Sequence, residues 1–297
     1  MNTEKRNELE VLDHFRVNVP TIPQMFYNTV HNAGSRPANT FKSGKEWKTI
    51  NYSEWAKISE EIAISLIQHG VKKGDDICIM SKLSAQRGWA DMAILLTGAV
   101  SATITPLVRD KEIKYIINRS DAKYIFVENR MMLQRMVSLW DELPSLKGII
   151  CMEENYAGNQ TNIWGLEEFQ ADSTGGSLLT SDLADYWQRL TPDDPARLDY
   201  TSGTTGRLNC SQIKHGEWFK GERQEHRKIL LENLNGNYNN VFTSIMPMAS
   251  IKERTTGFFS MVAIGALIKF GCGPSEVKNL WEIKEMRSAE AKQTRAV

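Results

Sequence analysis

The chain has 297 residues, about twice the usual length of one domain, so one large or two modest domains are expected. With 41% hydrophobic residues, 20 glycines and 9 prolines, it can bury a core and is neither fibrous nor broadly disordered. The 36 Lys and Arg residues balance the 36 Asp and Glu residues, which argues against a dedicated nucleic-acid-binding protein.

The cysteines and the apolar runs indicate a cytoplasmic protein. Cys78, Cys151, Cys210 and Cys272 are far apart and form no Cys-x-x-Cys pair, so reduced thiols are expected and a zinc site or disulfide framework is not. The first residues include no apolar stretch that suits a signal peptide. The longest charge-free run, residues 92–108, contains glycine and proline and suits a buried core element better than a membrane span.

From about residue 50 onwards, helical and strand-like segments alternate along the chain. The expected helices cover about residues 53–70, 85–98, 111–118 and 130–143, and the expected strands cover 77–80, 102–105, 123–127 and 148–152. Short apolar strands that alternate with helices imply right-handed crossovers and a sheet covered on both faces. The predicted fold class is therefore α/β, with a doubly wound and mostly parallel sheet.

Two later regions interrupt this alternation. Residues 153–185 are rich in Asn, Gly, Ser, Thr and acidic side chains, and they predict a long surface excursion between two halves of the sheet. Near the end of the sequence, a helix is expected from about Gly273 to Met286. Residues 287–297 carry no apolar face and predict a frayed, solvated tail.

The most informative stretch is residues 200–206, YTSGTTG, where a strand that ends near Tyr200 is expected to give way to a loop. Its two glycines allow backbone N–H groups to approach a ligand, its hydroxyl side chains add donors, and loops at the C-terminal edge of a parallel sheet commonly bind ligands. The P-loop pattern GxxxxGK[ST] is absent, so the residues alone fit either another phosphate-binding loop or a surface turn. The candidate phosphate-binding residues are Thr201, Ser202, Gly203, Thr204, Thr205 and Gly206.

Several motifs in the same order carry a family resemblance. The loop reads YTSGTTGRLNC where the family reads YTSGTTGxPKG, and residues 246–255, MPMASIKERT, are similar to the family segment LPLAHxxERT. Residues 70–75, GVKKGD, and 112–116, EIKYI, match two further patterns. Over roughly residues 20 to 285 the sequence resembles the AMP-forming adenylating enzymes, most closely the long-chain fatty acyl-CoA synthetases.

This resemblance implies a two-step ligase reaction. ATP and a fatty acid give an acyl-adenylate and pyrophosphate, and CoA then takes the acyl group, so the implied cofactors are ATP, Mg²⁺ and CoA. Because an oxyanion attacks an α-phosphorus surrounded by negative charge, metal and cationic groups are needed to stabilise the transition state. The resemblance assigns the β- and γ-phosphates to the loop. The implied partners are a fatty acid and a nucleotide, and no nucleic acid.

Two substitutions depart from the family pattern. Asn209 stands where the family loop has lysine, and the loss of that cation costs about one to a few kcal/mol of phosphate stabilisation. Arg207 or Lys214 could partly compensate. Ser250 replaces the histidine that lies near the carboxylate and adenylate in the family, and serine cannot carry charge at neutral pH.

The third departure is that the sequence ends before the family's YGxTE motif and its mobile C-terminal domain. The expected organisation is an N-terminal extension (1–20), a partial AMP-binding domain (21–286) and the frayed tail (287–297), with the C-terminal lid domain absent. A truncated long-chain fatty acid–CoA ligase, impaired or inactive alone, is therefore expected, and a separate C-terminal fragment could complete it. The alternative is a non-catalytic remnant with at most weak ATP or acyl binding. The expected location is the cytoplasm, and the sequence is also compatible with peripheral association with a membrane.

Other residues admit two interpretations each. His215 could act near the phosphate loop, but the favoured interpretation is that it only starts a helix and has no such role. Met246, Met248, Phe258, Phe259 and Met261 could line an acyl tunnel, but ordinary core packing is favoured.

Overall fold

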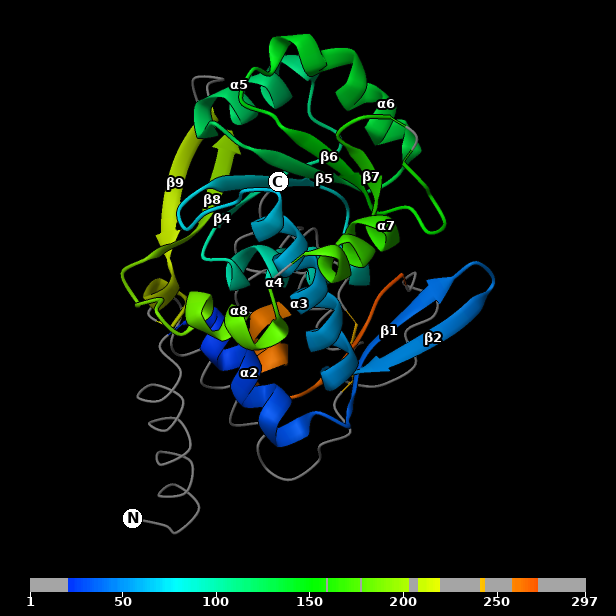
Figure 1. Ribbon diagram of the computed structural model, residues 1–297, viewed down its shortest axis with the longest axis vertical. Coiled ribbons are helices and arrows are strands. Elements are labelled where there is room, and N and C mark those ends of the chain that lie inside the picture. Colours follow the sequence, from blue (N-terminus) through cyan, green and yellow to red (C-terminus); the bar gives the residue numbers. More distant parts are fainter. Residues whose placement is uncertain are drawn as a thin grey trace, which may run out of the picture.

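The computed structural model describes residues 21–158, 160–176, 178–202, 208–219, 241–243 and 258–271. These residues form a seven-stranded sheet, a second sheet of four strands, and helices that pack on and between the sheets (Figure 1). No helix in these ranges is both long and apolar enough to cross a membrane.

The seven-stranded sheet has the order β7-β6-β5-β3-β4-β8-β9, and only the β8–β9 pair is antiparallel. The chain enters at the central β3, places β4 on one side, and then crosses over to β5, β6 and β7 on the other side. This order confirms the doubly wound, mostly parallel α/β sheet that the sequence predicts. The strands are β3 (Asp76–Met80), β4 (Val100–Ile104), β5 (Tyr124–Val127), β6 (Gly148–Cys151), β7 (Ile163–Gly165), β8 (Pro195–Ser202) and β9 (Leu208–Lys214).

Helices cover both faces of this sheet, because successive strand residues alternate between two cores. Helices α3 and α4 lie on one face of the sheet and α5 and α6 on the other (Figure 1). Ile77 and Ile79 of β3 belong to a core with Trp55 on the side of α3 and α4, whereas Cys78 and Met80 belong to a core with α5 and α6. The helices are α2 (Ile22–Ala33), α3 (Tyr52–Gln68), α4 (Ala85–Leu96), α5 (Asp110–Ser120), α6 (Arg130–Leu139), α7 (Leu166–Ala171), α8 (Thr180–Trp187) and α10 (Ser260–Ala263), with short 3-10 helices η1 (Trp140–Glu142), η2 (Asp172–Gly175) and η3 (His215–Phe219).

The start of α3 shows how a local motif fixes a helix boundary. Asn51 and Glu54 form a capping box: Asn51 Oδ1 accepts from the Glu54 backbone N–H at 2.8 Å, and Glu54 Oε2 accepts from the Asn51 N–H at 2.7 Å. The N-cap is therefore Asn51, two residues before Ser53, the cap that the sequence predicted, and the helix begins at Tyr52.

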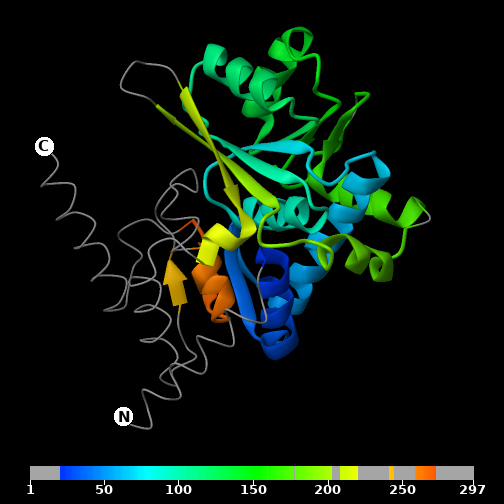
Figure 2. The same cartoon turned by 90° about the vertical axis from the view of Figure 1, so that its left-hand side faces the viewer.

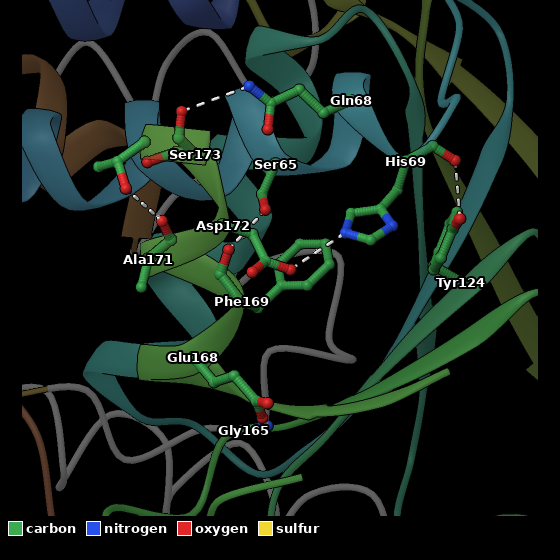
Figure 3. Close-up of polar contacts among 11 residues, drawn as sticks. Ser65, Gln68, His69, Tyr124, Gly165, Glu168, Phe169, Ala171, Asp172 and Ser173 are labelled. Atoms are coloured by element: carbon green, nitrogen blue, oxygen red, sulfur yellow. Dashed lines mark hydrogen bonds and ion pairs between the residues drawn. The ribbon is translucent and has the colours of Figure 1, made fainter. Parts of the chain in front are cut away.

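The predicted surface excursion at residues 153–185 is wrong in part, because this segment contains β7, α7, η2 and α8. Phe169 of α7 is fully buried in the core beside α3. Figure 3 shows the polar contacts that hold α7 and η2 on the end of α3: Ser65 Oγ donates to the Phe169 carbonyl at 2.5 Å, and His69 Nε2 lies 3.3 Å from Asp172 Oδ2. The apolar residues are too sparse in this polar segment to show a period in the sequence, but they are sufficient to anchor it.

The second sheet packs against α3 and α4 and has the order β10-β11-β1-β2. Its β1 strand runs parallel to β11 and forms an antiparallel hairpin with β2. Neither this hairpin nor α2 is predicted from the sequence. Phe258 packs in the core with its ring centre 5.7 Å from that of Trp55, and Phe259 is also fully buried. Both positions agree with the predicted core packing. The strands are β1 (Pro37–Ser43), β2 (Glu46–Asn51), β10 (Val241–Thr243) and β11 (Leu267–Lys269).

Candidate functional site: the β8–β9 hairpin

The candidate phosphate loop joins two strands at one edge of the large sheet. β8 runs parallel to β4 and then pairs with the antiparallel β9, with Ser202 opposite Leu208 (Figure 2). The loop therefore leaves the carboxyl end of a parallel strand, as predicted, which is where α/β folds commonly bind ligands. Thr201 and Ser202 form the end of β8, while Gly203, Thr204, Thr205 and Gly206 lie outside the described residues, as does Ser250.

Asn209 and Lys214, two residues that could affect the charge at the loop, lie at opposite ends of β9. Asn209 is exposed and pairs with Thr201, one residue beyond the start of the strand. Lys214 pairs with Pro195 at the other end, which is about 17 Å from Asn209 at the usual rise of a strand. Its Nζ contacts Asp193 Oδ1 at 3.1 Å. Lys214 therefore does not replace the loop cation, and Arg207 lies outside the described residues.

His215 follows Lys214 and is buried at this distant end of β9, so the structure does not support a role beside the phosphate loop. The Ile22 backbone N–H donates to His215 Nδ1 at 3.4 Å, while Nε2 has no hydrogen-bond partner within the described ranges. Burial lowers the pKa of His215 to about 4, with Asp194 acting in the opposite direction and Lys73 in the same direction. The imidazole is therefore neutral at pH 7 and connects β9 to the start of α2.

A buried polar layer under β8 was not anticipated from the sequence. Arg87 Nη2 donates to Thr103 Oγ1 at 2.8 Å, and on β8 Arg197 Nε lies 2.9 Å from Asp199 Oδ2. The layer consists of Arg87 and Asp91 of α4, Ser101 and Thr103 of β4, and Arg197 and Asp199 of β8, all of them buried.

This layer lies below the strand that carries the loop. Arg197 and Asp199 occupy alternate positions on β8, so their side chains share one face of the strand. Buried charges are retained in proteins when they are paired and hydrogen-bonded. The hydrogen bonds of the layer join α4 to β4, the strand that pairs with β8. The sequence signal of the layer is the pair Arg87 and Asp91, four residues apart in an otherwise apolar helix.

The side chain of Asn209, next to the loop at the start of β9, can donate a hydrogen bond. The Asn209 amide can donate to a phosphate oxygen, but it does not neutralise its charge. Within the described ranges, no three His, Cys, Asp or Glu side chains form a group that could hold a metal ion.

Comparison with known proteins agrees with this architecture. The family described as AMP-binding enzyme matches residues 26–285. The long-chain-fatty-acid–CoA ligase ACSBG2 of Rattus norvegicus is 25% identical over 253 residues, which cover 84% of this chain and 37% of the relative. ACSBG2 of Xenopus laevis is 27% identical over 195 residues, which cover 66% of this chain and 26% of the relative. The chain thus spans about a third of the length of these curated relatives.

Solved structures show the same fold. The anthranilate CoA ligase AuaEII, in complex with anthranoyl-AMP, has a TM-score of 0.68 at 16% identity over 86% of this chain and 46% of that protein. The fatty acyl-adenylate ligase of L. pneumophila, in complex with acyl adenylate and pyrophosphate, has a TM-score of 0.63 at 14% identity over 86% of this chain and 40% of that protein. Because the family match covers most of the sequence, the chain belongs to the AMP-binding enzyme family.

Proposed function

We propose that the chain binds ATP and a long-chain fatty acid and contributes to the formation of an acyl-adenylate, the first half-reaction of a fatty acid–CoA ligase. The observation that carries this proposal is the position of the signature loop at the carboxyl end of β8, within a chain of the AMP-binding enzyme family. Similarity to long-chain-fatty-acid–CoA ligases supports the choice of substrate and the use of CoA in a second half-reaction.

The proposed roles follow from the chemistry of the loop. The backbone N–H groups and hydroxyls of residues 201–206 hold the β- and γ-phosphates, and Ser250 belongs to the neighbourhood of the acyl-adenylate. Mg²⁺ bound with the nucleotide supplies positive charge that offsets phosphate repulsion. The buried polar layer holds α4 on β4, which pairs with β8, and in this way it supports the strand from which the loop starts.

Adenylation is proposed to be slow, because Asn209 gives the loop an uncharged donor where the family has lysine. The position of Lys214, about 17 Å along β9 from Asn209 and beside Asp193, supports this proposal. The uncharged Asn209 and the distant position of Lys214 also favour a second candidate function, in which the protein binds a nucleotide or an acyl chain without turnover.

The two candidate functions are separated by measuring oleate-dependent pyrophosphate release from Mg-ATP by the wild type and by Asn209→Lys. A restored cation that stabilises the transition state by about 1.4 to 3 kcal/mol raises kcat by about tenfold to a hundredfold. Gln212→Lys is the matched control, because it adds the same charge to an exposed position of the same strand, about 10 Å further along.

An oleate-dependent rate that increases in Asn209→Lys but not in Gln212→Lys supports the ligase function. If no oleate-dependent pyrophosphate is released by either variant in folded samples, the ligase function is rejected in favour of binding without turnover.

A further inference from the structure

The loop-bearing end of the β8–β9 hairpin extends beyond the strand that supports its base. Within the described residues, β8 pairs with β4 only at Arg197 and Leu198, whereas the strand continues to Ser202. Residues 199–202 pair in the strand register with residues 208–211 of β9, which is the edge strand of the described sheet. We call these two segments the hairpin arm. An isolated two-stranded ribbon is marginally stable, so the arm needs support from another element.

Helix α5 lies beside the hairpin arm and supplies this support (Figures 1 and 2). Tyr200 and Leu208, one on each strand, are partly buried against the core that α5 shares with the sheet. The Tyr115 hydroxyl of α5 donates to the Leu208 carbonyl at 3.5 Å. Because Leu208 pairs with Ser202, this hydrogen bond joins α5 to the backbone at the end of the arm next to the loop.

Core packing does not require a tyrosine at position 115. The buried residues of α5 are Ile113, Ile116, Ile117 and Ser120, whereas Tyr115 is 45% exposed. Substitutions at exposed positions usually change the free energy of unfolding little. The contact of the hydroxyl with the arm, rather than with the core, therefore indicates a local role.

We propose that Tyr115 is a positioning residue, which holds the hairpin arm on α5 and thereby places the loop for the phosphates of ATP. This inference rests on the proposed function, because it assigns a support to the same nucleotide site. Asn209 follows Leu208 directly on β9, so the hydrogen bond of Tyr115 also limits the movement of the amide donor beside the loop. Groups that are held in place before a ligand arrives lose less conformational freedom on binding, which increases the affinity.

The expected effect of the Tyr115 hydroxyl is small. The hydrogen bond joins two neutral groups, it is long, and the tyrosine is partly exposed to solvent. Loss of one such bond corresponds to about a threefold change in the equilibrium between the held and the released arm.

The test compares the wild-type chain with Tyr115→Phe, which removes the hydroxyl and keeps the ring. Tyr186→Phe is the matched control, because it removes the same group from a tyrosine of α8, a helix that packs with α3 and α4 across the large sheet from α5. Amide hydrogen exchange of peptides that cover residues 208–214 is measured by mass spectrometry without nucleotide. The affinity for Mg-ATP is then measured by calorimetry, and urea unfolding verifies that each variant is folded.

The inference predicts that the amides of residues 208–211 exchange about threefold faster in Tyr115→Phe, that this variant binds Mg-ATP about threefold more weakly, and that Tyr186→Phe changes neither quantity. Unchanged exchange in Tyr115→Phe, or an equal change in Tyr186→Phe, overturns the inference. Faster exchange with unchanged affinity for Mg-ATP also overturns it, because Tyr115 then supports the arm without positioning the nucleotide site. Absence of Mg-ATP binding by the folded wild type is a different failure: it rejects the proposed function, and the role of Tyr115 in binding with it.

Discussion

His215 is predicted to make the stability of this chain depend on pH. The unfolded chain protonates this histidine near its ordinary pKa of 6.5, whereas burial lowers the pKa in the folded state to about 4. Between these values the unfolded state binds more protons than the folded state, so acidification destabilises the fold. At about 1.4 kcal/mol per pH unit, the full loss is about 3 kcal/mol, and it is complete near pH 4.

The assay is urea unfolding of the wild type and of His215→Asn at several pH values from 7.5 to 4. Asparagine does not titrate, and it can place an acceptor near the position of Nδ1, which accepts from the Ile22 N–H. At pH 7.5 the variant is expected to be about 1 to 2 kcal/mol less stable, because it leaves part of the site unfilled. The wild-type advantage then shrinks as the pH falls, and the order of stability reverses by pH 4.

The comparison between variants is necessary because other groups titrate in the same range. A stability difference between wild type and His215→Asn that stays constant from pH 7.5 to 4 would refute the assignment of a neutral, buried imidazole.

Three further substitutions test the packing and the electrostatics. Gly88→Ala places a methyl group 2.8 Å from the Phe258 ring and is expected to cost about 1 to 3 kcal/mol in urea unfolding, while Gly175→Ala meets no atom within 4 Å and leaves stability nearly unchanged; equal effects contradict this packing. Phe169→Ala is expected to cost about 3 to 5 kcal/mol in the same assay, whereas a loss below 1 kcal/mol indicates that α7 is not part of the core. Burial, with Asp75 and Asp121 nearby, raises the pKa of Asp76 to about 6, so Asp76→Asn is expected to stabilise the fold above pH 6 and to lose this advantage as the pH falls towards 4; a gain that persists at pH 4 contradicts the charge argument.

The central part of the fold could be predicted from the sequence because periodicity and burial agree there. The four predicted strands and four predicted helices between residues 53 and 152 all occur, with boundaries that shift by a few residues. Phe169 was missed because its neighbours are polar and the apolar positions of that segment are too few to show a helical or strand period. Only contact with α3 makes α7 part of the core.

The candidate site shows a different limit. Lys214 and His215 are near the signature loop in sequence, which suggested that they could act beside it. Instead, β9 is an extended strand that carries both residues away from the loop at about 3.4 Å per residue. The buried pair of Arg197 and Asp199 could not be predicted for the complementary reason: alternation places both side chains on one face, but only the packing of α4 and β4 shows that this face is covered.

The most direct test of the central claim is calorimetric titration of the folded chain with Mg-ATP, with Thr204→Val as the loop variant and Ser211→Ala, on the exposed part of β9, as the control. We expect binding by the wild type, competition by pyrophosphate, and about tenfold weaker binding by Thr204→Val, which corresponds to the loss of one hydrogen bond to a charged group. Absence of Mg-ATP binding in a folded sample, or identical affinities for wild type and Thr204→Val, would contradict a phosphate-binding role for the loop at the end of β8.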